Sequence, residues 1–316
     1  MPELARIVTM PEHIEVAPPT VEATYKAREV EAFVDRHFYR KVGFQLAQWF
    51  AQCNVSPAAV TLLGGAFGIV AGHLYYYRDL RLNLLGVGLH MVANAMDNAD
   101  GQLARLLNRQ SRAGRLLDGF VDYVIWLGIY LHLALRCAAS GESASVWILA
   151  GLAVLSHGWQ AMTADYCRNA YLYFVKGAAG FDSARDLENE HRLISWRQTF
   201  EKLLLKLYLH LTRQQEVLVP GLKRLRERVA RNFPEALPGW LPSRYRSLAH
   251  SLPKLCSWLM SNARIFLLFC VFVIGEPVWF FWIEVTLFNA LLVFLIFRQE
   301  EVSRLMIELV EQPPPT

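Results

Sequence analysis

The chain has 316 residues, of which 54% are hydrophobic and only 19% are charged. Because soluble proteins average about 25% charged residues, this composition argues against a water-soluble domain and favours a membrane protein. The formal net charge of +4 is too small, and too dispersed along the chain, to predict a nucleic-acid partner.

The first predicted element is a helix over residues 30–50. Its apolar residues recur at close to helical spacing, with Arg36, Arg40 and Lys41 between them. We interpret it as an amphipathic helix that lies in the membrane interface, and a short buried helix is the alternative. The apolar residues of this helix are Phe33, Phe38, Val42, Leu46 and Phe50.

Six apolar stretches follow that are long enough to cross a bilayer, which takes about 20 residues. Between the last two, Gly275, Glu276 and Pro277 predict a tight turn. The predicted fold class is therefore an all-α integral membrane protein, with six transmembrane helices preceded by an interfacial amphipathic helix. The predicted spans are residues 57–77, 82–103, 116–138, 145–174, 257–274 and 278–297.

Basic residues are concentrated on one side of this predicted bundle. If the N-terminus is cytoplasmic, the outer side carries only Arg78, Arg81 and Arg136 of the 32 Lys and Arg residues. The positive-inside rule then places both termini in the cytoplasm. The predicted segments are a cytoplasmic N-terminal segment at 1–55, spans one to four at 56–176, a cytoplasmic basic helical loop at 177–256, spans five and six at 257–298, and a C-terminal tail at 299–316.

The long loop at 177–256 contains a basic segment and an apolar stripe, both of which are predicted to be helical. Residues 223–231 form a basic helical segment, for which attraction to anionic lipid and a solvated face are both open interpretations. Upstream of this segment, apolar residues predict the stripe of an amphipathic helix. The stripe consists of Leu193, Phe200, Leu204, Leu207 and Leu211.

The first span carries Gly64, Gly68 and Gly72, each four residues apart. Residues at this spacing share one face of a helix. Small residues there let neighbouring helices approach closely, so we expect tight packing at this face rather than chemistry.

Chemistry is concentrated in residues 97–122, which read DNADGQLARLLNRQSRAGRLLDGFVD. Asp97 and Asp100 are three residues apart and Asp118 and Asp122 are four apart, so each pair shares a helix face. Because the two helices are consecutive and joined by a short basic linker, we expect the four carboxylates to meet at the cytoplasmic membrane boundary. Four unpaired anions there would be strongly unfavourable. Hard oxygen ligands without His or Cys predict Mg²⁺, Mn²⁺ or Ca²⁺.

The residues between the acids predict what the metal ions hold. Gly101 and Gly114 lack side chains, which lets a bulky ligand touch the helix backbone. Arg105 lies one turn beyond Gly101 and can pair with phosphate. Two metal ions, an arginine and two glycine openings fit a nucleoside diphosphate ester.

This segment resembles the signature of the CDP-alcohol phosphotransferase family, D-x2-D-G-x2-A-R-x8-G-x3-D-x3-D. The six-span layout and the interfacial helix are similar to the family as well. One departure is Ser56-Pro57-Ala58 at the start of the first span, where the family often has Ser-Pro-Asn, and this position does not touch the metal site. Every spacing of the signature is kept, at Asp97, Asp100, Gly101, Ala104, Arg105, Gly114, Asp118 and Asp122.

The resemblance implies a role for each residue of the signature. Asp97, Asp100 and Asp118 would hold two divalent ions, Mg²⁺ or Mn²⁺, and Asp122 would complete the second ion's site. Asp122 would also be the general base that takes the proton from the acceptor hydroxyl. The resemblance further implies a homodimer. The cytidine diphosphate pocket would be lined by Gly101, Arg105 and Gly114.

The implied reaction is metal-dependent transfer of a phospho-alcohol from a CDP-linked donor to an acceptor hydroxyl, with release of CMP. We favour phosphatidyl transfer from CDP-diacylglycerol to a small polar acceptor. Transfer from CDP-choline or CDP-ethanolamine to diacylglycerol shares the signature and is the alternative. A membrane cation transporter is an alternative of another class. It predicts acids near the bilayer midplane, whereas these acids cluster at one end with an arginine and two glycines.

Two arginines outside the signature are candidates for binding the acceptor. Arg168 in the fourth span shares a face with Asp165, and Arg264 opens the fifth span on the cytoplasmic side. Together they predict a site for an anionic acceptor such as a sugar phosphate or glycerol phosphate, and positive-inside anchors are the alternative. In the sixth span, Glu284 and Asn289 predict hydrogen bonds between helices.

Overall fold

The computed structural model describes residues 29–30, 33–177, 181, 183–193 and 199–312, without the side chains of residues 112, 199–201 and 204. Within these ranges the regular elements are all helices, which confirms the predicted all-α class. Short π-helical turns, η2 (Asp35–Tyr39) and η4 (Glu284–Phe288), interrupt two of them. In chain order the α-helices are α1 (Arg40–Gln52), α2 (Pro57–Leu74), α3 (Leu80–Leu106), α4 (Arg112–Ala139), α5 (Ser145–Lys176), α6 (Ala184–Leu193), α7 (Thr199–Leu218), α8 (Pro220–Asn232), α9 (Trp240–Leu248), α10 (Leu252–Trp258), α11 (Ser261–Ile274), α12 (Val278–Ile283) and α13 (Asn289–Glu311).

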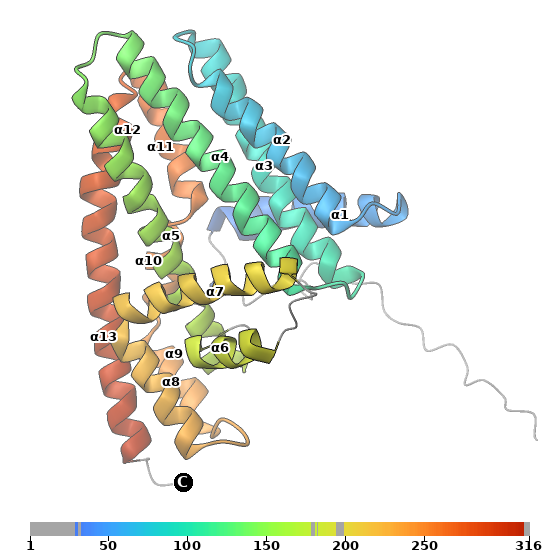
Figure 1. Cartoon of the computed structure of the whole chain (residues 1–316), viewed down its shortest axis with the longest axis vertical. Coiled ribbons are helices and arrows are strands. Elements are labelled where there is room, and N and C mark those ends of the chain that lie inside the picture. Colours follow the sequence, from blue (N-terminus) through green and yellow to red (C-terminus); the bar gives the residue numbers. More distant parts are fainter. Residues whose placement is uncertain (1–28, 31–32, 178–180, 182, 194–198, 313–316) are drawn as a thin grey trace, which may run out of the picture.

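Several of these helices are suited to a membrane. By length and composition, three helical stretches of the described chain can cross a bilayer: α2, the stretch 113–139 in α4, and the stretch 278–311 from α12 through α13. The pair α10 and α11, bent by 43°, makes a fourth if it counts as one span. Figure 1 shows α3 and α5 running alongside these helices. The membrane class is supported, and the number of six spans stays a prediction.

Helix α2 is wedged against α3 and α4 through its glycine face, as predicted. A Cβ atom added to Gly68 would lie 2.6 Å from Cδ1 of Ile125 in α4, and one added to Gly64 would lie 3.1 Å from Cβ of Met96 in α3. Gly65 is equally close, because its added Cβ would lie 2.7 Å from Cγ1 of Val121. The absence of side chains therefore sets the spacing between the three helices that surround the acidic residues.

The predicted amphipathic helix before the first span is helical, as η2 and α1. One face is buried against α3 and α2, where Ala47 and Phe50 pack with Ala99 and Leu103. The other face remains apolar and exposed at Phe33, Phe38 and Trp49. The helix thus has two opposite apolar faces, one packed against the protein and one exposed. This arrangement suits a helix that lies in the membrane interface.

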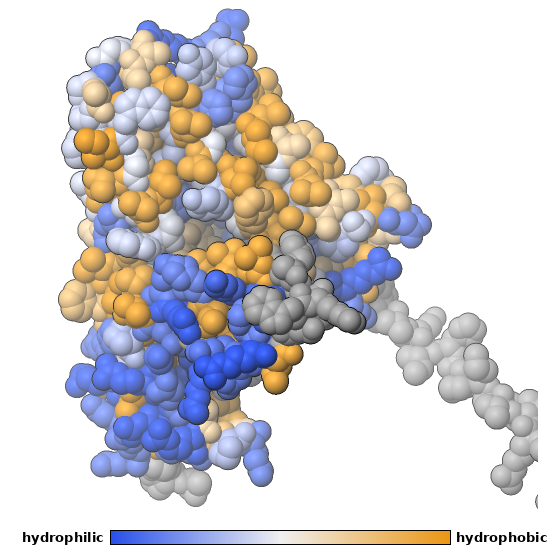
Figure 2. All heavy atoms as spheres, in the orientation of Figure 1, coloured by the Kyte–Doolittle hydropathy of each residue, from blue (hydrophilic) through white to orange (hydrophobic). Residues whose placement is uncertain are grey.

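Helices α6 to α9 form a separate layer at one end of the molecule (Figure 1), where hydrophilic surface replaces the hydrophobic surface of the rest (Figure 2). Within it, α8 packs along the last turns of α13, and Leu222, Leu225 and Val229 share a buried cluster with Val302 and Met306. This packing keeps α13 helical as far as Glu311. The segment predicted as a C-terminal tail from residue 299 therefore begins with helical turns whose buried partner lies on α8, and its boundary as a separate segment stays a prediction. Residues 313–316 of that tail lie outside the described part of the chain.

Glu216, at the end of α7, joins this helix to α6 and α8. One carboxylate oxygen accepts hydrogen bonds from the backbone N of Ala184 at 3.0 Å and from Nη2 of Arg226 at 2.6 Å. The other oxygen pairs with Nζ of Lys223 at 2.9 Å. Burial alone would raise the pKa of the Glu216 carboxyl, but these three donors outweigh burial and hold the pKa below its ordinary value. The layer is thus tied together by a carboxylate that stays charged.

Candidate active site

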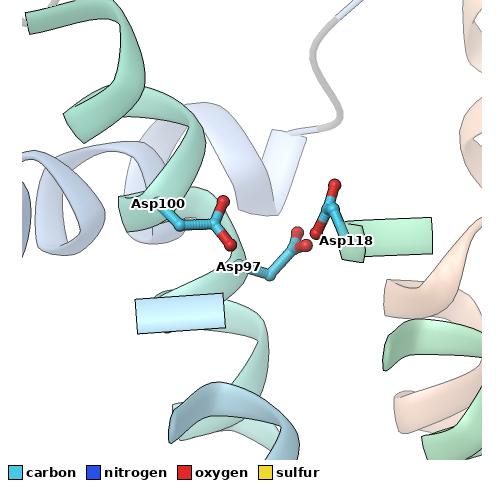
Figure 3. A group of neighbouring side chains, drawn as sticks. All are labelled: Asp97, Asp100 and Asp118. Carbon is cyan, nitrogen blue, oxygen red and sulfur yellow. The ribbon is translucent and has the colours of Figure 1, made fainter. Parts of the chain in front are cut away.

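The four predicted acids converge where α3 ends and α4 begins. Asp97 and Asp100 project from α3 and Asp118 from α4, with their carboxyl groups turned toward one another (Figure 3). One oxygen atom from each of these three residues lies within 4.8 Å of the other two. Asp122, one turn further along α4, lines the same cavity. The four acids are three residues apart on one helix and four apart on the next. The fold brings both pairs together in one cluster.

The cavity that these acids line is bounded by α2, α3, α4 and α11. Its lining combines the four carboxylates and other polar groups with apolar or aromatic residues such as Val121, Ile125 and Trp126, which suits a ligand with a charged part and an apolar part. The residues other than the acids that line it are Thr61, Gly64, Gly65, His90, Ala93, Asn94, Val121, Ile125, Trp126 and Ser261.

This donor set fits divalent cations. Carboxylates as close as those of Asp97, Asp100 and Asp118 repel one another strongly in a partly buried site. Among the described residues, no Lys or Arg lines the cavity to offset them. An all-oxygen set of carboxylates is the coordination that Mg²⁺, Mn²⁺ and Ca²⁺ prefer. The predicted ligands therefore form a site that a hard cation would stabilise.

Thr61 on α2 belongs to this site, although it is part of no sequence motif. Its hydroxyl group donates a hydrogen bond to Oδ2 of Asp100, and its side chain is buried. A bond from a hydroxyl group leaves the second oxygen of Asp100 available for a cation and fixes the rotamer of the carboxylate. Partners that orient ligating carboxylates in this way are important for metal affinity.

Replacing Thr61 with Val is expected to weaken divalent-ion binding about tenfold to 100-fold. Valine has nearly the same shape but cannot donate, and a hydrogen bond to a charged group contributes about 1.5–3 kcal/mol. The measurement is the ion concentration that gives half-maximal CMP release. Thr61→Ser, which keeps the hydroxyl group, is the matched control. Wild-type ion dependence in Thr61→Val would contradict the positioning role of Thr61.

A chain of side-chain hydrogen bonds connects the cavity to η2, in the helix before the first span. Asn94 in the cavity wall donates from Nδ2 to Oδ1 of Asn262 at 2.8 Å, and Asn262 donates from Nδ2 to Oδ1 of Asp35 in η2 at 2.7 Å. The chain thereby fixes α3, α11 and η2 to one another beside the acids. Sequence analysis missed it, because its members are far apart in the chain and belong to no motif.

The remaining residues of the signature lie beside the cavity rather than in its lining. The guanidinium nitrogens of Arg105 lie 3.6 Å from the position of a Cβ added to Gly101, so this side chain folds back over the glycine. The backbone N of Gly114 donates to Oγ of Ser111 at 2.9 Å, which caps the start of α4. Binding of cytidine diphosphate by Gly101, Arg105 and Gly114 stays a prediction.

Arg168 and Arg264, the two candidates for acceptor binding, lie apart from the acidic cavity. On α5, Nη2 of Arg168 pairs with Oδ1 of Asp165 at 2.8 Å, and the side chain is partly exposed. Neither arginine is among the residues that line the cavity. The structure does not bring them together with the four acids, and the acceptor role of Arg168 stays a prediction.

Arg264 is fully buried in a polar network between α5, α11 and η4. Its Nε donates to Oε1 of Glu284 at 2.8 Å, its Nη2 donates to Oε1 of Gln160 at 2.5 Å, and its Nη1 donates to the carbonyl of Leu259. Asn289 accepts a hydrogen bond from Gln160, so the interhelical bonds predicted for Glu284 and Asn289 are confirmed. These bonds occupy the guanidinium of Arg264, and its geometry supports a structural role rather than contact with an acceptor.

The helices suited to a membrane and the four carboxylates that meet at one end of α3 and α4 are the features that define the class of protein. Comparison with known families identifies the domain. Residues 54–169 match the model of the family described as CDP-alcohol phosphatidyltransferase. This range contains α2, α3, α4 and most of α5, and therefore the whole acidic cavity except Ser261. Over residues 54–169 the chain thus matches a CDP-alcohol phosphatidyltransferase domain.

Curated proteins similar to the chain include two with named activities. The phosphatidylinositol phosphate synthase of Streptomyces avermitilis is 33% identical over 129 residues, which is 39% of this chain and 51% of that protein. The bifunctional IPC transferase and DIPP synthase of Thermococcus kodakarensis is 26% identical over 168 residues, or 52% of this chain and 37% of that protein. The chain thus spans about half the length of the first relative and less of the second.

Proposed function

We propose that the chain catalyses phosphatidyl transfer from CDP-diacylglycerol to the hydroxyl group of a small polar acceptor, with release of CMP. The observation that carries the proposal is the convergence of Asp97, Asp100, Asp118 and Asp122 in one cavity inside the family domain. The apolar and aromatic residues that share the cavity lining with the acids, Val121, Ile125 and Trp126 among them, support a lipid-linked donor. The phosphatidyl group in the name of the Streptomyces relative supports this direction over aminoalcohol transfer to diacylglycerol.

Each side chain has a place in this reaction. Asp97, Asp100, Asp118 and Asp122 would hold two divalent ions, which when bound neutralise the diphosphate and stabilise the departing CMP. Thr61 orients Asp100. Asp122 takes the proton of the acceptor hydroxyl as that oxygen attacks the phosphorus atom of the phosphatidyl group. The bond from this phosphorus to the bridging oxygen breaks, and CMP leaves with the electron pair. Arg105 pairs with phosphate beside Gly101.

The test is a product assay with purified protein in nanodiscs. Labelled CDP-diacylglycerol, CDP-choline and CDP-ethanolamine are each offered with a panel of hydroxyl acceptors, and the lipid product is identified by mass. We expect CMP and a new phospholipid from CDP-diacylglycerol alone. A product from CDP-choline or CDP-ethanolamine with diacylglycerol would overturn the proposed direction.

Removal of divalent ions is expected to stop CMP release. Without cations the four carboxylates would repel the diphosphate of the donor, so excess chelator should reduce the rate to background. Adding back Mg²⁺ or Mn²⁺ should restore it. CMP release that persists in chelator would contradict the metal-dependent mechanism, and ion flux into proteoliposomes without CMP formation would favour the transporter class.

The proposal includes an orientation and a quaternary state. The acidic cavity and both termini would face the cytoplasm, which is supported by the concentration of Lys and Arg in the segments on that side. Figure 1 shows α6, α8, α9 and the end of α13 beyond the level where α3 ends and α4 begins, in keeping with one common side. A homodimer stays a prediction.

A further inference from the structure

Helix α7 carries a row of exposed leucines. Leu203, Leu207 and Leu211 are four residues apart and so share one face of the helix. Their side chains are 63%, 48% and 37% exposed. Leu207 and Leu211 belong to the stripe predicted from the sequence, but that stripe is not the face that packs on the protein.

The opposite face of α7 is the one buried in the fold. Leu205 and Leu209 form a cluster with Ala184 and Leu187 of α6. Thr212 and Glu216 continue the same buried face. Positions 205, 209, 212 and 216 lie about half a turn of helix away from 203, 207 and 211. The exposed leucines therefore point away from α6 and from the hydrophilic layer to which α6 belongs.

The position of α7 explains where this face points. Figure 1 shows α7 lying across the long helices rather than along them, and it also contacts α4 and α5. Figure 2 shows that hydrophobic surface covers the molecule down to about the level of α7 and that hydrophilic surface begins below it. Helix α7 thus lies at the level where the apolar surface of the membrane helices ends.

Basic residues border the leucine face on one side. Lys206 is exposed next to Leu207, and Lys202 and Arg213 lie on the same flank of the helix. Arg213 is paired with Glu188 of α6, which leaves Lys206 as the exposed charge closest to the leucines. An apolar face with a basic flank matches a membrane leaflet that carries anionic head groups.

We propose that α7 lies on the membrane as a second surface helix, on the same side as the acidic cavity. Leu203, Leu207 and Leu211 enter the boundary between head groups and acyl chains, and Lys206 faces anionic lipid head groups. The occupant of this face is the lipid bilayer itself. The helix thereby fixes the α6–α9 layer at the height of the cavity, across the bundle from α1.

Spin-label accessibility in nanodiscs tests the proposal. The background is the full chain with Cys53→Ser, which removes the exposed thiol. One label is placed at Leu207→Cys. The lipid control is Ile148→Cys on α5, where the native side chain is 69% exposed, and the aqueous control is Ala230→Cys, an exposed position on α8. Leu203→Cys is the second variant on the same face.

The expected result is that labels at Leu207 and Leu203 collide with lipid-soluble oxygen, as Ile148 does, while the Ala230 label collides with a water-soluble nickel complex. Adding phosphatidylglycerol to phosphatidylcholine nanodiscs should move the Leu207 label deeper, and Lys206→Gln should remove that shift. Labels at Leu207 and Leu203 as accessible to nickel as the Ala230 label would overturn the proposal. Labels shielded from both probes, with spin–spin broadening, would identify a second copy of the chain as the occupant and overturn it as well.

Discussion

Asp122→Asn is expected to lower kcat about 10²- to 10⁴-fold, the usual contribution of a general base, while binding of CDP-diacylglycerol stays measurable. Asparagine has nearly the same size as aspartate, so the packing of α4 is preserved, but the amide cannot take up the proton of the acceptor. The other three acids stay in place to hold cations and the donor. CMP release under saturating donor, and donor binding by filtration, are the two measurements.

The matched control is Asp79→Asn. Asp79 lies at the opposite end of α3 from Asp97 and Asp100, where its carboxylate accepts a hydrogen bond from the backbone N of Arg81 at 2.7 Å. Asparagine caps a helix about as well as aspartate, so this variant should keep wild-type activity. Full activity of Asp122→Asn would remove Asp122 as the base. Loss of donor binding together with turnover would assign Asp122 to cation binding alone.

Glu284→Gln is expected to lower the free energy of unfolding by about 3–5 kcal/mol, the cost of breaking a buried ion pair by removing one partner. The side chains of Glu284 and Arg264 are both fully buried, and their charged atoms lie 2.8 Å apart. The substitution leaves the guanidinium with only neutral acceptors, the side-chain oxygen of Gln160 and the carbonyl of Leu259. Reversible unfolding in mixed micelles measures the change.

A second substitution separates this cause from simple disruption of packing. Removing both charges with Arg264→Met and Glu284→Gln should recover most of the lost stability, because no uncompensated charge remains in the core. Glu276→Gln, at an exposed position in the turn before α12, is the control and should leave stability unchanged. A double variant no more stable than Glu284→Gln alone would contradict this account of the network.

Features encoded by neighbours in the sequence could be predicted. The two pairs of acids depend only on helical spacing, and the structure places all four in one cavity. The turn between the fifth and sixth predicted spans follows from Gly275, whose φ of +86° ends α11 in a conformation that favours glycine. The glycine face of α2 also follows from spacing. Each is a local rule of the backbone, and no contact between distant segments is needed to infer it.

Features that depend on how neighbouring helices are aligned along their axes could not be predicted from the sequence. The hydrogen bond from Thr61 to Asp100 forms only at one axial position of α2 relative to α3. No pattern in the sequence predicts that relative position. Arg264 was interpreted as a candidate ligand for an anionic acceptor, because its partner Glu284 is 20 residues away on an antiparallel helix. On α7, apolar residues occupy two opposite faces, so hydropathy alone did not reveal that Leu205 and Leu209 form the buried one.

The glycine face of α2 limits which sequences this domain can accept during evolution. No carboxylate lies on α2, yet a single methyl group added at Gly65 or Gly68 would come within 3.0 Å of Val121 or Ile125, the residues on either side of the turn of α4 that bears Asp122. Accommodating it requires these side chains to change rotamer or α4 to move away, and a movement of α4 would carry the carboxylates with it. Natural selection for catalysis therefore also acts on α2, although no charged side chain of this helix takes part in the reaction. We expect substitutions of Gly65 and Gly68 to be selected against, as substitutions of the four acids are.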